Sequence, residues 1–585
     1  MAIKWDLKCI YDTKKHFEND LQKLKEWNKK IPSYKGKLDN KEDILSYYKF
    51  CSEYSRLSSR VGCYAYLNHD IALDDDYYIK KMEEIESVGV EAERLSAFVM
   101  PELVSLSEEF LLSLKEDKDF ALYTHSIESI LKDKKHTLSE EVEYALALTE
   151  SFLGGFCKVR DFLMELEMTY APVIVDGESK ELTDANYVKF LTNENRSIRE
   201  NAYNNMYKSI KQFKHTIASL FINDLKADSF DLKLRNYNNL LEASLEAQEI
   251  PKNIYYSLIK YVNDNNHLMQ RYFTLLGKYK GIDKVHFYDV YTTISKPANN
   301  VFDFDKQKKL ALEVVKVYGR EYVKHFKYLL ENRVDVEPAS NKAGGAYCLH
   351  LYDEGEFVLL NNVDDFSSLS TLLHEMGHAM HSYYSINNQP YELSDYSIYV
   401  AEIASTMNEI LLNDYMRKHT KDVNEKIYYI EQMILLIKST IFRQTMFSEF
   451  EEYAHSMVEK DMPLTVDSLT EKYKELLQNY FGDSVQVDDN IVYEWMRIPH
   501  FYRAYYVYKY ATSLIVAINV GNKILQGDEN LKKKYINMLK SGGCDYPNNL
   551  LLELGIDLSS NEPYEYVFDY LKKLIDELEY LLNKK

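Results

Sequence analysis

The sequence predicts a mainly α-helical protein, and three observations indicate this fold class. The 585 residues include only 11 prolines and 19 glycines, which favours long helices with little linker. Apolar residues recur three or four positions apart over long stretches, as they do on one face of a helix. A short β-like run at 357–361 directly precedes a helical segment, so we expect a strand just before that helix.

The N-terminal elements follow one another with clear boundaries. Residues 12–170 have the helical pattern, with a break at Gly154–Gly155. Residues 173–182 predict a small hairpin on an Asp-Gly turn. Thr183 or Asp184 then caps the next helix.

The chain is too long for one hydrophobic core, so more than one lobe is expected. We expect an N-terminal helical lobe at 1–182 and a second region at 183–585 that carries the candidate catalytic motifs. Helices in the second region are interrupted by a loop at 297–300 and resume from about residue 396.

Charge and composition exclude several classes of partner. The net charge is −21, from 71 basic and 92 acidic residues, which argues against nucleic acid and anionic membranes as partners. The six cysteines are scattered without a C-x-x-C pair, as is typical of a reducing compartment. No apolar signal segment follows Met1, and no run of about 18 apolar residues occurs. We therefore expect a cytoplasmic protein, either a monomer or a small homo-oligomer.

The strongest motif is H-E-x-x-H at His374–His378. Residues four apart share a helix face, so His374 and His378 can bind one metal ion. Glu375 lies next to them, where a general base for an activated water is needed. Ser367–Ser370 supply candidate N-caps for this helix.

A catalytic zinc ion usually takes three protein ligands, so one more is needed. Glu402 is the preferred candidate, because a carboxylate within an apolar stretch must be compensated. Glu409 shares its helix face and can orient a histidine ligand. His381 is a candidate for packing or for support of the ligands, while Glu392 and Asp395 stay open as alternative ligands.

Two further stretches suggest contacts with a substrate. An exposed edge of the run that contains Phe357 and Leu359 can pair with an extended peptide, although a plain buried strand is the alternative. Gly344 and Gly345 would then allow a close approach of the two backbones. Residues 495–510 are rich in Tyr and contain His500; such groups can stabilise an oxyanion, but aromatic helix packing also explains them.

These motifs together resemble peptidase family M3, in particular its oligoendopeptidase F type. The resemblance covers nearly the whole chain and rests on the following segments: Trp5–Leu7, Asn236–Tyr237, Leu241–Leu245, His286–Tyr291, Gly344–Tyr347, Phe357–Asn361, His374–His381, Val400–Ser405, Ile498–Tyr502, Ser541–Gly543 and Asp545–Pro547.

The resemblance implies one zinc ion per chain, bound by His374, His378 and Glu402, with Glu375 as the general base. It also implies that His500, Tyr502, Tyr505 and Tyr508 contact the scissile carbonyl. The implied fold is two helical lobes around a deep substrate channel, with a small sheet next to the zinc-binding helix.

The implied activity is hydrolysis of internal peptide bonds in short oligopeptides. Two alternatives stay open at this point. One is an exopeptidase of similar fold, such as a dipeptidyl carboxypeptidase or a carboxypeptidase. The other is a catalytically inactive peptide-binding protein.

Overall fold

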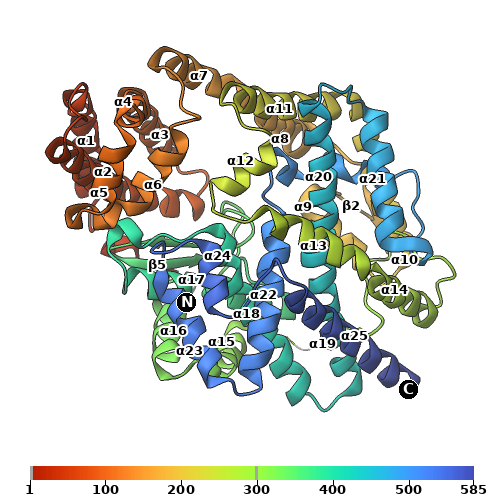
Figure 1. Cartoon of the computed structure of the whole chain (residues 1–585). Coiled ribbons are helices and arrows are strands. Elements are labelled where there is room, and N and C mark those ends of the chain that lie inside the picture. Colours follow the sequence, from red (N-terminus) through yellow and green to blue (C-terminus); the bar gives the residue numbers. More distant parts are fainter. Residues whose placement is uncertain (1–3, 297–300, 585) are drawn as a thin grey trace. The chain divides into compact units, whose positions relative to one another are not determined.

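The computed structural model describes residues 4–296 and 301–584, and helices dominate it (Figure 1). The predicted mainly α-helical class is confirmed. The chain divides into two units, each assembled from three segments. The predicted division into residues 1–182 and 183–585 stays a prediction, and the predicted loop at 297–300 lies outside the described residues.

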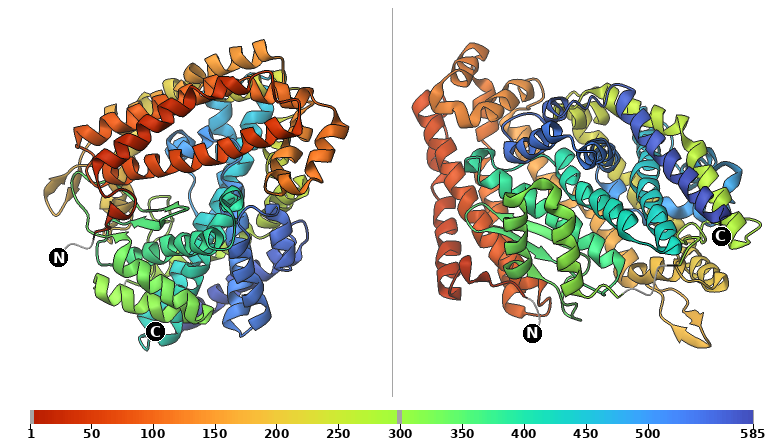
Figure 2. Two further views of the ribbon diagram at one scale, coloured as in Figure 1. Left: turned by 90° about the vertical axis from the view of Figure 1, so that its left-hand side faces the viewer. Right: turned by 90° about the horizontal axis from the view of Figure 1, so that it is seen from below.

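The first unit comprises Met1–Thr149, Asn300–Leu412 and Val520–Leu554. Its elements are α1 (Lys14–Asn28), α2 (Lys41–Asp70), α3 (Asp76–Ser96), α4 (Val99–Ser105), α5 (Glu108–Lys115), α6 (Thr124–Asp133), α15 (Phe304–Val314), α16 (Arg320–Asn332), β3 (Val334–Asp335), β4 (Tyr347–Leu351), β5 (Gly355–Leu359), α17 (Phe366–Ile386), α23 (Glu529–Ser541) and α24 (Pro547–Glu553). The long helices α1, α2 and α3 pack against one another (Figure 2).

The second unit comprises Glu150–Asn299, Asn413–Asn519 and Gly555–Lys585. Its elements are α8 (Gly155–Asp161), β1 (Val173–Val175), β2 (Glu178–Lys180), α9 (Asp184–Leu191), α10 (Arg196–Gln212), α11 (Lys214–Leu234), α12 (Leu240–Glu246), α13 (Lys252–Asp264), α14 (Asn266–Lys280), α19 (Val423–Ile437), α20 (Arg443–Glu459), α21 (Val466–Phe481) and α25 (Glu562–Asn583). Three helices have residues in both units: α7 (Glu140–Leu153), α18 (Ile398–His419) and α22 (Tyr508–Leu525).

Several local predictions are confirmed. The break at Gly154 separates α7 from α8. Strands β1 and β2 form an antiparallel hairpin, in which Asp176 and Gly177 have φ of 51° and 86°. This left-handed pair is the backbone that a tight Asp-Gly turn requires. Thr183 caps α9 through its side chain, which accepts a hydrogen bond from the N–H of Asn186.

The three-stranded sheet corrects one prediction about the substrate contact. Its strand order is β3-β5-β4, so β5 is the central strand and both of its edges are paired. Phe357 and Leu359 lie on β5 and are fully buried. The prediction that this run offers an open edge is therefore wrong, because β3, only two residues long, pairs with it in parallel. The strand at the sheet's edge on the other side is β4.

Helix α17 packs against β4, β5 and α23, and carries the H-E-x-x-H motif. Its N-cap lies two to five positions before the predicted serine caps. Asp365 is the N-cap, and its side chain accepts a hydrogen bond from the N–H of Ser368 at 2.7 Å. The negative charge of Asp365 also interacts favourably with the N-terminal end of the helix dipole.

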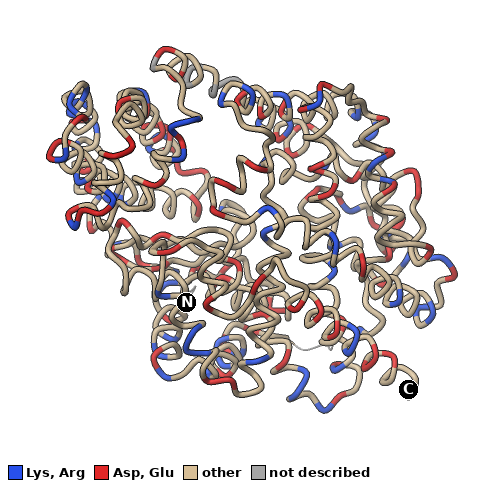
Figure 3. The backbone as a smooth tube through the Cα atoms, viewed as in Figure 1, with Lys and Arg blue, Asp and Glu red and all other residues tan. Residues whose placement is uncertain are grey.

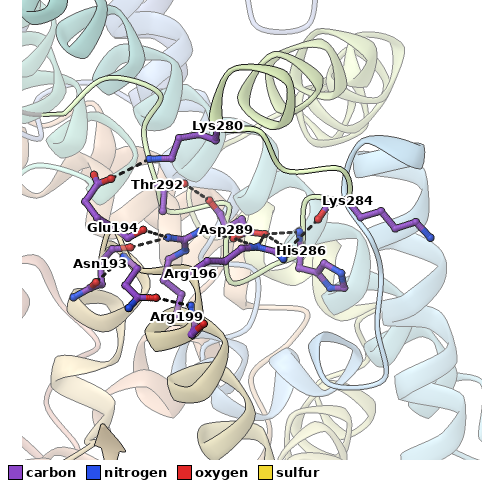
Figure 4. Close-up of polar contacts among 11 residues, drawn as sticks. Asn193, Glu194, Arg196, Arg199, Lys280, Lys284, His286, Asp289 and Thr292 are labelled. Carbon is purple, nitrogen blue, oxygen red and sulfur yellow. Dashed lines mark hydrogen bonds and ion pairs between the residues drawn. The ribbon is translucent and has the colours of Figure 1, made fainter. Parts of the chain in front are cut away.

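In the second unit, an ionic cluster links helix α10 to the segment that follows α14 (Figure 4). The fully buried carboxylate of Asp289 accepts hydrogen bonds from Arg199 at 2.6 Å and from Arg196 at 3.0 Å. Its Oδ2 also accepts the N–H of His286 at 3.0 Å. This buried anion therefore has cationic and neutral donors around it, as a buried charge requires.

Candidate metal centre

The side chains of His374 and His378 on α17 meet Glu402 on α18 in the first unit. Potential ligand atoms of the three residues lie within 4.8 Å of one another. Oε2 of Glu402 is 3.5 Å from Nε2 of His374 and 3.6 Å from Nε2 of His378. All three side chains are mostly buried, between 13% and 26% exposed.

This donor set fits a zinc ion. Ligand atoms bound to tetrahedral zinc at about 2.1 Å lie about 3.4 Å from one another. The two separations of 3.5 and 3.6 Å are close to this value. Two imidazole nitrogens and one carboxylate oxygen also match a catalytic zinc site, which leaves a fourth position for water or substrate.

Gly377 lets α17 and α18 approach closely. A Cβ at this position would lie 2.5 Å from the carbonyl oxygen of Ala404 and 2.6 Å from Cα of Ser405. Any larger side chain would therefore push α18, and Glu402 with it, away from the two histidines. The sequence analysis missed this role, although a glycine within a helical pattern is a signal of close packing.

The carboxylate of Glu402 is held in place by its own helix. The hydroxyl of Ser405 donates to Oε2 of Glu402 at 2.9 Å. Asn408 ties α18 to α17, because its Nδ2 donates to the carbonyl of Leu373 at 2.9 Å. The alternative ligands Glu392 and Asp395 do not belong to this three-residue group.

His381 lies one turn beyond His378 and packs instead of joining the group. It is fully buried and stacks on the ring of Tyr396, with ring centroids 3.7 Å apart. The hydroxyl of Tyr396 contacts the carbonyl oxygen of His378 at 3.5 Å and Ser382 at 2.8 Å. His381 therefore supports the helix segment that carries His378.

Glu409 lies behind His374. Its Oε1 is 3.6 Å from Nδ1 of His374. Burial alone lowers the pKa of His374, but the hydrogen bond and charge of Glu409, with the charge of Glu402, outweigh it and raise the pKa to about 9. Burial lowers the pKa of His378 to about 4. A carboxylate at Nδ1 leaves Nε2 as the nitrogen for a metal.

Glu375 is the buried carboxylate beside the two histidines. Burial raises its pKa to about 7, and the charges of Glu402 and Glu409 contribute to the increase. The carboxylate accepts a hydrogen bond from the backbone N–H of Cys348 on β4. A carboxylate that titrates near neutrality and is held by a strand suits a general base.

A cavity of about 560 Å³ adjoins these groups in the first unit. His374, Glu375 and Glu409 line one side, and Gly345 and Ala346 line another. Nothing lies within 4 Å of a Cβ built at Gly344 or Gly345, so both glycines are open to a ligand. The φ of 74° at Gly345 also requires a glycine.

Two residues that the sequence analysis missed fix this glycine loop. Asn361 donates through Nδ2 to the carbonyls of Ala343 and Gly345, both at 2.9 Å. Lys342 donates to Asp335 and to the carbonyl of Leu360, both at 2.6 Å. The loop that faces the cavity is thus tied to the end of the sheet.

Comparison with known proteins decides the family. The profile of peptidase family M3 matches residues 189–569, and that of Oligopeptidase F matches residues 102–156. The chain belongs to peptidase family M3. The predicted family and the predicted class of enzyme, a metallopeptidase, are therefore confirmed.

Relatives match the M3 chain over its full length. "Oligopeptidase PepF" of Bacillus subtilis is 35% identical over 99% of this chain and 87% of its own. "Oligoendopeptidase F homolog" of Lactococcus lactis subsp. lactis is 31% identical over 100% of this chain and 98% of its own. The crystal structure of oligoendopeptidase-F from Enterococcus faecium is 29% identical, covers 98% of this chain and 100% of its own, and has a TM-score of 0.79.

The remaining predicted site residues of this M3 peptidase lie in the second unit, around η10 (Pro499–Tyr502) and the start of α22. Tyr505 and Tyr508 are buried, and Tyr502 packs against the ring of Phe221. His500 is partly exposed and lies near the ring of Tyr506. The predicted contacts of these residues with substrate stay predictions.

Two further tyrosines of the same stretch are more accessible than Tyr505 and Tyr508. Tyr506 and Tyr510 are partly exposed, and their hydroxyls lie 3.4 Å apart. Both rings lie near that of His500, with centroids 6.4 and 6.1 Å away. The sequence alone does not distinguish Tyr506 and Tyr510 from Tyr505 and Tyr508. All four lie in one aromatic segment, and they differ only in burial, which the sequence does not show.

Proposed function

We propose that this chain is a zinc-dependent endopeptidase that hydrolyses internal bonds of short oligopeptides, with one zinc ion per chain. Membership of family M3 and the names of the relatives, oligopeptidase and oligoendopeptidase, support the proposal. The observation that carries it is the convergence of His374, His378 and Glu402 beside the buried carboxylate of Glu375.

The zinc ligands in this proposal are His374, His378 and Glu402. When bound, zinc acidifies a water molecule and polarises the substrate carbonyl. Glu375 accepts the proton of the attacking water as the water oxygen bonds to the carbonyl carbon. As the C–N bond breaks, Glu375 delivers that proton to the leaving amine. The N–H of Cys348 keeps the carboxylate in position throughout.

The substrate backbone lies along β4 and the loop of Gly344 and Gly345 in this proposal. Three features support it: β4 is at the edge of the sheet, the loop is open, and Gly345 and Ala346, just before β4, line the cavity beside Glu375. Extended peptides bind to such edges through backbone hydrogen bonds, so side-chain preference would be broad.

His500 and tyrosines of residues 502–510 stabilise the oxyanion in this proposal. Partial exposure favours Tyr506 and Tyr510 over Tyr505 and Tyr508. We further propose that residues 183–585 form the catalytic region, which the M3 match over 189–569 supports, and that a deep channel between two lobes limits substrates to short peptides.

Charge and helix composition bear on the remaining partners. Acidic and basic residues are interspersed along the chain (Figure 3). No helix among the described residues is long and apolar enough to cross a membrane. A cytoplasmic location, the lack of nucleic-acid binding and the choice between a monomer and a small homo-oligomer stay predictions.

The test is turnover of an internally quenched peptide with both ends blocked, measured together with metal content. We expect internal cleavage that a zinc chelator abolishes and added zinc restores. Cleavage only of peptides with a free end would favour an exopeptidase. A chain without bound metal and without cleavage would favour a peptide-binding protein.

The variant Glu375→Gln separates metal binding from proton transfer. Because the amide cannot take a proton, we expect turnover to fall by about 10²–10⁴-fold, with zinc content unchanged. Glu108→Gln, at the exposed start of α5, makes the same change away from the cavity beside Glu375 and is a control that should retain turnover. Activity close to that of the wild type in Glu375→Gln would remove Glu375 from the mechanism.

A further inference from the structure

A small internal cavity of about 40 Å³ lies within the second unit, far in sequence from the metal ligands. Residues from α9, α10, α14, α20, α21 and the 3₁₀ segment η9 (Ile491–Arg497) line it. Much of the lining is aromatic, but four charged side chains also reach the cavity: Lys438, Arg443, Arg497 and Glu494. Family M3 chemistry as described above uses none of them.

Positive charge exceeds negative charge around this cavity. Glu494 is the one carboxylate among the described residues that line it. Its two oxygens are already engaged, by Arg443 at 2.6 Å and by the hydroxyl of Tyr473 at 2.7 Å. Arg497 pairs with Asp184 at 2.9 Å. One cation, Lys438, is left without a carboxylate.

Lys438 is a buried ammonium with an incomplete set of partners. Its side chain is buried, and its Nζ donates to the carbonyl of Val290 at 3.2 Å. The ring of Tyr291 lies 4.7 Å from Nζ. In the described part of the chain no carboxylate forms an ion pair with it. An ammonium has three N–H donors, and only one of them has an oxygen acceptor among the described residues.

Other donors around the cavity are also unmatched. Tyr187 and Tyr207 are buried in the cavity wall, and the structure gives their hydroxyls no acceptor among the described residues. Nε of Arg497 is buried and has no hydrogen-bond partner there either. Unmatched buried donors are costly, so their concentration in one place calls for an acceptor.

The backbone at Lys438 is a second, independent sign of a binding site. Helices α19 and α20 are joined by a π-helical segment, Lys438–Phe442. Both ends of this segment, Lys438 and Phe442, line the cavity. π-Helical turns are rare and are frequent at functional sites, because they turn side chains away from the regular helix face.

We propose that this cavity binds one small inorganic anion of the size of chloride or bromide, held by Lys438 and by the hydroxyls of Tyr187 and Tyr207. A cavity of this volume holds more than one water-sized sphere, each needing roughly 10–15 Å³. An anion would neutralise the excess positive charge and would accept hydrogen bonds from the unmatched donors. Water would accept the hydrogen bonds but would not neutralise the charge.

The first test uses crystals of the full-length zinc-loaded protein, grown without halide and soaked in sodium bromide. We expect an anomalous bromide peak in the cavity within hydrogen-bond distance of Nζ of Lys438. Density without an anomalous signal would assign the cavity to water and overturn the proposal.

The second test measures the melting temperature while sodium chloride replaces sodium methanesulfonate at constant ionic strength. We expect a saturable rise in melting temperature for the wild type, because a ligand that binds only the folded state stabilises it. Lys438→Met should lose the rise, and Tyr207→Phe, which keeps the ring, should shift the midpoint to higher chloride.

Lys342→Met is the matched control, because it also removes a buried lysine, but from the first unit. Lys342→Met should show the same chloride-dependent rise in melting temperature as the wild type, measured from its own melting temperature without chloride. An equal rise in the wild type and in Lys438→Met would overturn the proposal. If Lys438→Met does not fold, the bromide peak and the Tyr207→Phe titration decide the question.

Discussion

The metal centre of the first unit and the cavity of the second unit have opposite imbalances of polar groups. At the metal centre, the carboxylates of Glu375, Glu402 and Glu409 surround two imidazoles, so acceptors and negative charge are in excess. Around the cavity, donors and positive charge are in excess. The excess of acceptors at the metal centre favours a bound cation, and the excess of donors around the cavity favours a bound anion.

Two buried lysines, Lys342 and Lys438, differ in how fully their hydrogen-bond donors are satisfied. Nζ of Lys342 donates to Asp335 and to the carbonyls of Glu337 and Leu360, so all its donors are satisfied. Nζ of Lys438 has one carbonyl acceptor and the positive charge of Arg443 nearby. Lys342 is complete without a ligand, whereas Lys438 is not.

Removal of Glu402 is expected to have the largest effect on the acceptor-rich site. In Glu402→Ala two ligands remain, and we expect loss of both bound zinc and peptide hydrolysis. Asp395→Ala is the matched control, since Asp395 precedes the same helix but lies outside the ligand group. Metal content of purified protein checks the prediction. One zinc ion per chain in Glu402→Ala would show that another residue is the third ligand.

Removal of Lys342 is expected to have the next largest effect, on stability. Both side chains of the Lys342–Asp335 pair are 2% exposed, so Lys342→Met leaves a buried carboxylate without a cation. We expect a loss of about 3–5 kcal/mol in the free energy of unfolding. Lys438→Met should cost less, because it leaves no carboxylate unpaired. Chemical unfolding of both variants measures the difference.

The double variant Lys342→Met, Asp335→Leu sharpens this result. It removes both charges of the buried pair, so much of the lost stability should return. If the double variant were no more stable than Lys342→Met, the cost would come from packing or from the carbonyl of Leu360, and not from the stranded charge.

Local sequence patterns predicted which three side chains meet at the candidate metal centre, but they predicted long-range packing poorly. His374 and His378 follow from one helical turn, and Glu402 from a charge in an apolar stretch. Gly377 and the short strand β3 acquire their roles only through partners distant in the sequence. Burial separates Tyr505 from Tyr506, and no pattern within the segment gives that difference.

The donor-rich cavity was not predictable for the same reason. Tyr187, Lys438 and Arg497 are spread over more than 300 positions, and each alone is ordinary in a helical protein. Two features of the cavity became visible only in the structure: the neutralisation of Glu494 by Arg443, and the π-helical turn at Lys438.

Glu409 is expected to have a smaller effect than Glu402, and one that depends on pH. His374 with a pKa of about 9 is protonated at pH 7 and must release that proton to bind zinc. Glu409→Gln lowers this pKa, so fewer protons should be released at pH 7. Above pH 9 proton competition disappears, and we expect about 10–100-fold weaker zinc binding from the lost orientation of His374.

Calorimetric titration with zinc in buffers of different ionisation enthalpy measures both quantities. The wild type should release about one proton from His374 at pH 7. Ser370→Ala is a mild control, because its hydroxyl also contacts Glu409 but carries no charge. Equal proton release in the wild type and in Glu409→Gln would show that Glu409 does not set the pKa of His374.

The smallest expected effect is the pH dependence that Lys438 gives to stability. Burial and the charge of Arg443, opposed by the charge of Glu494, lower its pKa from the ordinary value of 10.5 to about 7 in the folded chain. Between these values the unfolded chain holds one more proton than the folded chain. The free energy of unfolding should therefore rise with pH, by at most about 1.4 kcal/mol per pH unit.

Urea unfolding at pH 7.5, 8.5 and 9.5 of the wild type and of Lys438→Met isolates this contribution, because every other titrating group is common to both proteins. Without halide, the difference between the two proteins should change with pH in favour of the wild type. In saturating chloride the anion keeps Lys438 charged in the folded chain, so the difference should become independent of pH. If the free energies of unfolding of the wild type and of Lys438→Met changed with pH in parallel without halide, Lys438 would stay charged without a bound anion. Lys438 would then not differ from Lys342 in needing a ligand.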